Sequence, residues 1–61
     1  SVKSGDLVTV KDCHGYNVYM QNLVGHIGIV LDIGRIATKV FILDRIRHLN
    51  PNDLEILNES R

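Results

Sequence analysis

The fold is decided by residues 27–43, which read IGIVLDIGRIATKVFIL. Two runs within this stretch, 27–32 and 37–43, are rich in β-branched and aromatic residues, and Gly34 and Arg35 separate them. Such side chains fit the pleated surface of a strand, and a short glycine-containing break between two strand-like runs is typical of a hairpin. We therefore predict that the two runs are neighbouring antiparallel strands.

The segment before this hairpin predicts one strand and one loop. In residues 5–11, Val8 and Val10 alternate with polar side chains at the two-residue period of a strand. Residues 12–24 have no such period and are rich in glycine, asparagine and glutamine, which favour loops. The first strand is therefore expected to lead into a long, partly ordered loop.

The segment after the hairpin predicts two more strands. Residues 46–49 alternate, and Pro51 ends them because proline cannot donate a hydrogen bond to a sheet. Residues 51–53 suit a single 3-10 turn, and residues 54–57 form the last strand. The chain 1–61 is thus expected to be one all-β domain of five strands.

Length and composition set limits on how this domain is stabilised. A chain of 61 residues buries only about 60% of the surface that it exposes when unfolded, so its stability is marginal. It has 44% hydrophobic residues, enough to fold, but its single cysteine cannot form an internal disulfide and the ligand spacings of structural zinc sites are absent. Self-association is the remaining way to add stability.

Charge and hydropathy argue against several function classes. Seven basic residues balance seven acidic ones, so no overall positive field attracts nucleic acid or an anionic membrane. No apolar run approaches the ~20 residues of a membrane span, and the first residues lack the pattern of a signal peptide. With one unpaired thiol, at Cys13, the chain is expected in a reducing cytoplasm.

Three short motifs connect this pattern to a known family. They are Gly5-Asp6-x-Val8-x-Val10, Gly25-x-x-Gly28-x-Val30 and Asp53-Leu54-Glu55-Ile56. Together they cover nearly the whole chain, and their order resembles that of a small five-stranded SH3-like barrel with a long first loop. The closing strand with its short polar tail is similar to small uncharacterised SH3-like proteins of tailed bacteriophages. This resemblance implies a fold and a setting, that of a phage accessory protein in the host cytoplasm, without implying a reaction.

A narrower resemblance is to the KOW element of transcription and ribosomal proteins. Residues 24–30 have a glycine flanked by alternating hydrophobics, as KOW segments do. RNA-binding KOW segments usually carry Lys or Arg beside that glycine, whereas here only His26 stands near it. A glycine kept for the curvature of the barrel explains the same pattern. The nucleic-acid-binding residues that this alternative implies are His26, Arg35, Lys39, Arg45 and Arg47.

The central hairpin has more hydrophobic residues than a solvated sheet needs. Ile29 and Leu31 lie on one face of their strand and Val30 on the other, and Phe41 likewise lies opposite its apolar neighbours. Strands that are apolar on both faces are buried on both faces, so either the long loop or another subunit covers the outer side. We therefore predict a homo-oligomer whose interface includes Ile27, Ile29, Leu31 and Phe41.

Two tyrosines of the long loop extend this predicted interface. Tyr16 and Tyr19 lie where signalling SH3 domains place aromatic residues that receive proline-rich peptides. Those grooves normally include tryptophan, which this chain lacks. A loop tyrosine that packs its ring on the core and hydrogen-bonds its hydroxyl is the simpler interpretation.

The pair Cys13-His14 is the only other candidate for chemistry. Adjacent residues of an extended chain point to opposite faces, so these two side chains do not form a nucleophile and its base. We expect no catalytic residue, no metal and no cofactor. The sequence is therefore interpreted as a small non-catalytic protein-interaction module that associates with itself, and the alternative is a KOW-like RNA- or DNA-binding module.

Overall fold

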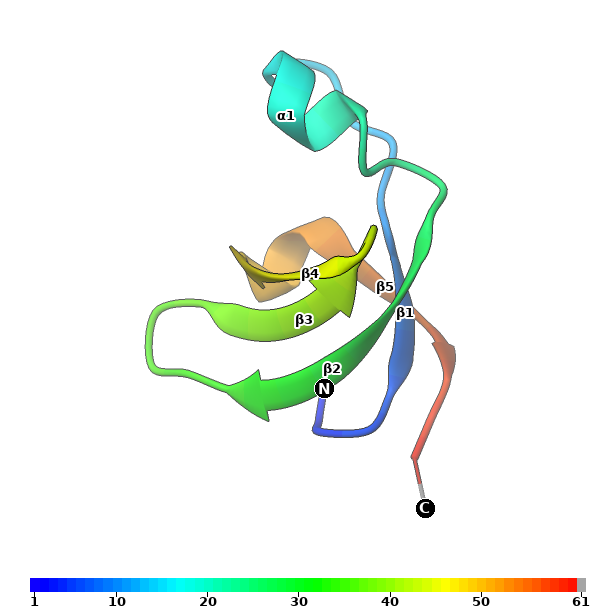
Figure 1. The fold of residues 1–61 in the computed structure, drawn as a ribbon, viewed down its shortest axis with the longest axis vertical. Helices are drawn as coiled ribbons and strands as arrows, with labels where there is room; N and C mark the ends of the chain where they lie inside the picture. Colours follow the sequence, from blue (N-terminus) through cyan, green and yellow to red (C-terminus); the bar gives the residue numbers. More distant parts are fainter. Residues whose placement is uncertain (61) are drawn as a thin grey trace.

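The computed structural model describes residues 1–60, which form five strands, one short helix and one 3-10 helix (Figure 1). In chain order these elements are β1 (Leu7–Val10), α1 (Val18–Gln21), β2 (Ile27–Ile33), β3 (Thr38–Ile42), β4 (Arg45–Leu49), η1 (Pro51–Asp53) and β5 (Leu54–Asn58). The predicted all-β class, the five strands and the 3-10 turn before the last strand are confirmed.

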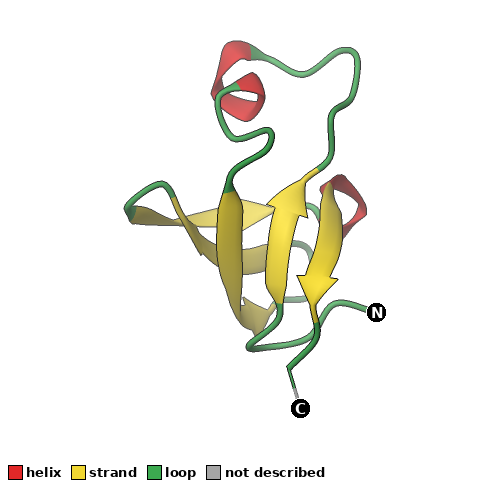
Figure 2. Ribbon diagram, turned by 90° about the vertical axis from the view of Figure 1, so that its right-hand side faces the viewer, coloured by secondary structure: helices red, strands yellow, loops and turns green. Residues whose placement is uncertain are grey.

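All five strands belong to one antiparallel sheet with the order β4-β3-β2-β1-β5. In Figure 2, β1 runs between β2 and β5, and the hairpin of β3 and β4 crosses behind them. The sheet therefore bends around β2, the strand shared by the two parts. Within residues 1–60, β4 and β5 remain its two edges, so closure into a barrel stays a prediction.

The core lies on the inner side of this bend. Eight apolar side chains are buried there, and most come from alternate positions of the strands: Val8, Val10, Leu23, Val30, Val40, Ile42, Leu49 and Leu54. Leu23 is the exception, since it lies at the end of the long loop and anchors that loop to the sheet. Within each strand the buried residues therefore follow the two-residue period of β structure.

Gly28 allows β2 and β3 to approach each other closely. A Cβ at this position would lie 2.7 Å from Val40 Cγ1 and 3.0 Å from Ile42 Cβ. Real side-chain atoms do not pack at such distances, so a larger residue would push the two strands apart. Gly28 therefore leaves room for the neighbouring strand β3.

The long loop is more ordered than the sequence predicted. Residues Val18–Gln21 form the single-turn helix α1, and the Asn17 side chain caps it by accepting the Met20 amide hydrogen at 2.9 Å. None of its residues is buried, so no apolar period marked it, and the only signal was asparagine, a preferred N-cap residue. Of the helices in residues 1–60, none is long and apolar enough to cross a membrane.

Asp6 ties the two ends of the described chain together. Its buried carboxylate accepts the Ser60 amide at 2.7 Å, the Lys3 amide at 2.9 Å and Lys3 Nζ at 3.3 Å. The amide of Ser60, and then that of Lys3, lowers the pKa of Asp6 because both donate to the charged carboxylate. The carboxylate of Asp6, just before β1, is therefore the anchor of the C-terminal segment.

Candidate protein-binding surface

A row of apolar side chains crosses four strands on the outer face of the sheet. In the strand register, Leu7 pairs with Ile29, Ile29 pairs with Phe41, and Phe41 pairs with Ile46. Neighbouring strands lie about 4.8 Å apart, so the row is roughly 14 Å long. Its side chains are 37%, 38%, 44% and 51% exposed, respectively. Each therefore contacts its cross-strand neighbour and also presents close to half of its surface to solvent.

Three more apolar residues widen this row. Ile27 and Leu31 belong to β2, and Leu43 lies in the turn between β3 and β4. We give the name outer patch to six of the exposed apolar residues between β2 and β4, leaving out Ile33 and Ile36: Ile27, Ile29, Leu31, Phe41, Leu43 and Ile46. Full burial of such a side chain is worth about 1.5–3 kcal/mol, so burying the exposed portions of all six would contribute on the order of 6 kcal/mol.

The structure brings four of the predicted interface residues together in the outer patch. Ile27, Ile29, Leu31 and Phe41 share the outer face, and sequence reasoning missed Leu43 and Ile46. Ile46 lies opposite Phe41 in the register, so the alternation of residues 46–49 could have found it, whereas Leu43 lies in a turn where no two-residue period applies. Helix α1 stands at the end of the molecule away from both termini (Figure 1). The long loop therefore leaves the outer patch uncovered.

The two tyrosines hold the long loop in place and lie apart from the outer patch. Tyr16 is half-buried against the core, and its hydroxyl donates to Asp53 Oδ1 at 3.1 Å. Burial raises the pKa of Tyr16, and its hydrogen bond to the Asp53 carboxylate adds to that rise. The Arg47 guanidinium lies 5.1 Å from the centre of the Tyr19 ring, a cation–π contact that joins α1 to β4.

Arg47 supports an unusual turn at the tip of the β3–β4 hairpin. Its Nε donates to the Ile42 carbonyl at 3.0 Å and its Nη2 to the Leu43 carbonyl at 3.3 Å, and the residue is only 8% exposed. The turn consists of Leu43 and Asp44, with φ angles of 49° and 63°. Positive φ at both positions is the requirement of a type I′ turn, which favours asparagine and glycine, and it costs another residue roughly 1–2 kcal/mol.

The five basic residues considered for nucleic-acid binding do not gather on one face. His26 precedes β2 and accepts the Thr9 hydroxyl at its carbonyl, and Arg35 is exposed in the turn between β2 and β3. Lys39 lies on the outer face, where it pairs in register with Asp32 on β2 and with His48 on β4. Arg45 begins β4, and Arg47 points to the inner side. Of the five residues, only Lys39 therefore has a basic neighbour on the outer face, and that neighbour is His48.

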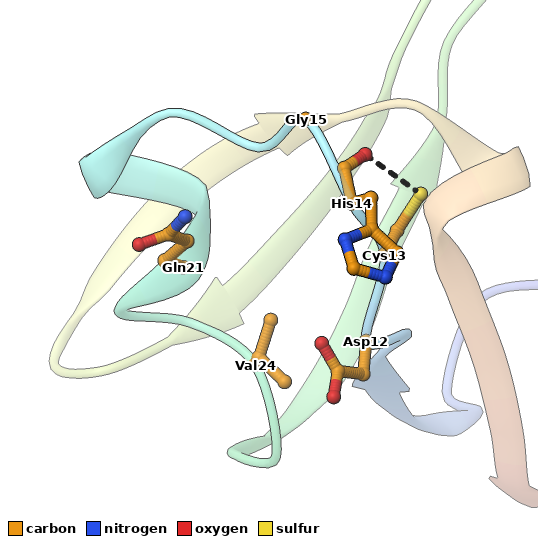
Figure 3. Close-up of a pocket in the computed structure, with 6 residues that line it drawn as sticks. All are labelled: Asp12, Cys13, His14, Gly15, Gln21 and Val24. Carbon is orange, nitrogen blue, oxygen red and sulfur yellow. Dashed lines mark hydrogen bonds between the residues drawn. The ribbon is translucent and has the colours of Figure 1, made fainter.

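An open cavity of about 440 Å³ lies beside the long loop (Figure 3). Its lining residues are Asp12, Cys13, His14, Gly15, Gln21 and Val24. The Cys13 thiol donates to the carbonyl oxygen of His14 at 3.4 Å, so it is directed to the backbone and not to the imidazole. Residues 1–60 contain no cluster of three side chains that could hold a metal ion. The contacts drawn in Figure 3 therefore supply no activated nucleophile.

Comparison with family models, curated proteins and solved structures gives no match to this chain. The function must therefore be argued from the geometry of the outer patch and of the residues around it.

Proposed function

We propose that this chain is a small non-catalytic protein-interaction module that binds protein through the outer patch. The observation that carries this proposal is the continuity of the patch: its six apolar side chains are exposed, and the strand register places Ile29, Phe41 and Ile46 side by side on one face. Small soluble proteins rarely expose a contiguous apolar surface of this kind unless a partner covers it.

The balance between buried and exposed side chains supports the proposal. Twelve large hydrophobic residues are exposed, whereas eight hydrophobic residues form the buried core. Scattered exposed leucines would need no explanation, but half of these twelve belong to the outer patch. Within residues 1–60, the outer patch therefore holds half of the large hydrophobic residues that are exposed.

The backbone of Leu43 is a second, independent support. A leucine at positive φ is disfavoured, and asparagine or glycine would fit this turn without strain. Leu43 is nevertheless apolar and 40% exposed, so its side chain adds little to the core. A residue that strains the fold and faces solvent serves something outside the fold, and a bound protein surface suits its chemistry.

The proposal includes a fold class and a setting. We assign the chain to the SH3-like barrels, supported by its order of elements and by the 3-10 helix before β5. The motifs at Gly5, Gly25 and Asp53 that resemble small phage proteins support a role as an accessory factor. Nucleic-acid binding is not carried forward, because Arg47 is occupied inside the protein and the formal net charge is zero.

Site-specific photo-crosslinking tests this proposal. A photoreactive phenylalanine analogue placed at position 41 should form protein adducts in cells, because Phe41 lies at the centre of the outer patch. The matched control is the same analogue at position 19, since Tyr19 is exposed to a similar degree, 48% against 44%, and lies on α1. Equal yields from the two positions, or no protein adduct from position 41, would contradict the proposal.

A further inference from the structure

We infer that the protein seated on the outer patch is a second copy of this chain, related to the first by a two-fold axis that passes beside Phe41. This inference rests on the proposed function and names its partner. It follows from the composition of the outer patch, from the charges at its two ends, and from the turn at Leu43.

The composition of the outer patch fits an interface between identical subunits. All six of its residues are apolar, with no charged side chain among them. Interfaces between different, transiently bound proteins are about as polar as the rest of the surface, whereas homodimer interfaces are more apolar. A patch without polar residues is also complementary to itself, which a two-fold interface requires.

The charges at the two ends of the outer patch favour one orientation of the two copies in the dimer. Asp44 lies at the turn end of the β3–β4 hairpin, and Lys39 lies at the other end, in register with His48 on β4 and with Asp32 on β2. From Lys39 to Ile42 the chain runs about 10 Å along β3 and then turns at Leu43 and Asp44, so Phe41 stands between the two charges. Arg45 belongs to the opposite set of β4 positions, with Arg47 and Leu49.

A two-fold axis across the middle of β3 pairs opposite charges at both ends of the outer patch. It places Asp44 of each copy beside Lys39 and His48 of the other, and it packs Phe41 against its counterpart. The strands of the two sheets then run in nearly opposite directions, as in aligned packing of two sheet faces. A foreign partner would need the same apolar centre and the same opposed charges, whereas a second copy has them by symmetry.

The size of the outer patch sets the strength of this dimer. Association costs translational and rotational freedom, which six half-exposed side chains offset only modestly, so we expect a dissociation constant between about 1 μM and 1 mM. Light scattering across roughly this concentration range should show the mass rising from 6.9 kDa toward twice that value. A constant monomer mass at the highest concentration would overturn the inference.

Substitution of Phe41, which lies beside the proposed two-fold axis, tests where the interface is. Phe41→Glu places a carboxylate opposite its own copy and should weaken association at least ~100-fold, while circular dichroism shows that the fold is kept. Val18→Glu is the control, because Val18 is exposed on α1 and should change association less than about twofold. An unchanged dimer in Phe41→Glu would place the interface elsewhere and overturn the inference.

A charge exchange tests the two-fold geometry itself. Asp44→Lys and Lys39→Asp each create like charges at both ends of a homodimer, so each variant alone should associate about 5-fold more weakly. An equimolar mixture restores both opposite-charge pairs and should form the mixed dimer at wild-type strength. A mixture that associates no better than the separate variants would overturn the proposed orientation.

Leu43→Asn should have opposite effects on the stability of the fold and on association. Asparagine suits the type I′ turn and should raise the melting midpoint of the dilute monomer by about 5 °C. Loss of the apolar side chain should at the same time weaken association several-fold. A gain, or no change, in association would contradict the role of Leu43.

A wild-type monomer whose position-41 crosslink nevertheless has the mass of a foreign protein would refute the dimer and leave the proposed function standing.

Discussion

The two faces of the same sheet have opposite environments although their residues are chemically similar. On β3, Val40 is fully buried, whereas its neighbour Phe41 is 44% exposed. The difference arises from the bend of the sheet, because the inner face encloses side chains from Leu23 and Leu54 while no described segment lies over the outer face. Hydrophobicity alone therefore does not make a sheet face part of the core, and an apolar face left outside is available to a partner.

The sharpest test of this comparison is to place a charge on each face in turn. Val40→Asp should unfold the domain, because an uncompensated buried charge costs about 3–5 kcal/mol. A chain of this length has a total stability of roughly 3–9 kcal/mol. Phe41→Asp should retain the cooperative melting transition, which circular dichroism would record. If both variants unfold, the outer face is also core in the folded protein.

A second comparison uses two arginines of β4. Arg47→Ala removes two hydrogen bonds to the carbonyls of the β3–β4 turn and the contact with Tyr19, so urea denaturation should show a loss of about 2–3 kcal/mol. Arg45→Ala, at an exposed position of the same strand, should change stability by less than about 0.5 kcal/mol. Similar losses in the two variants would refute the structural role of Arg47.

The two loop tyrosines give a smaller difference. Tyr16→Phe loses the hydrogen bond to Asp53 and should lower the free energy of unfolding by about 1 kcal/mol, whereas Tyr19→Phe should change it by less than about 0.5 kcal/mol. The pKa of Tyr16 is raised from 10.0, so its contribution is present below pH 10 and is lost as pH rises through the pKa of the folded state. Stability of Tyr16→Phe at high pH should therefore lack this step.

The smallest expected effect on stability concerns Asp6 and appears only at acidic pH. Its pKa in the folded protein is lowered from 3.8, so its contribution is present above that value and is lost as pH falls through the lowered pKa. Asp6→Asn should flatten the loss of stability below about pH 4 in acid titrations followed by circular dichroism. Asp12→Asn is the control for the substitution itself, since Asp12 is exposed in the lining of the loop cavity and the change should alter stability at neutral pH by less than about 0.5 kcal/mol.

Local patterns in the sequence predicted the fold well and the candidate site in part. The period of two in residues 5–11 and 37–43, and the proline after β4, placed the strands and the 3-10 helix within a few residues of their bounds. Helix α1 was not predicted because it buries no residue and so has no apolar period. Arg47 was grouped with the exposed cations, because sequence does not reveal which charged side chain turns inward to meet free carbonyls.

The sequence by itself determined the all-β class, the number and order of the strands, and the presence of more apolar residues than one face can hold. It could do so because strand propensity, turn residues and alternation act over a few neighbouring positions. Only the tertiary structure decided which apolar face became the core, which arginine was buried, and which residues met in the outer patch. Those outcomes depend on strand register and on the bend of the sheet, which bring together side chains that are far apart in the chain.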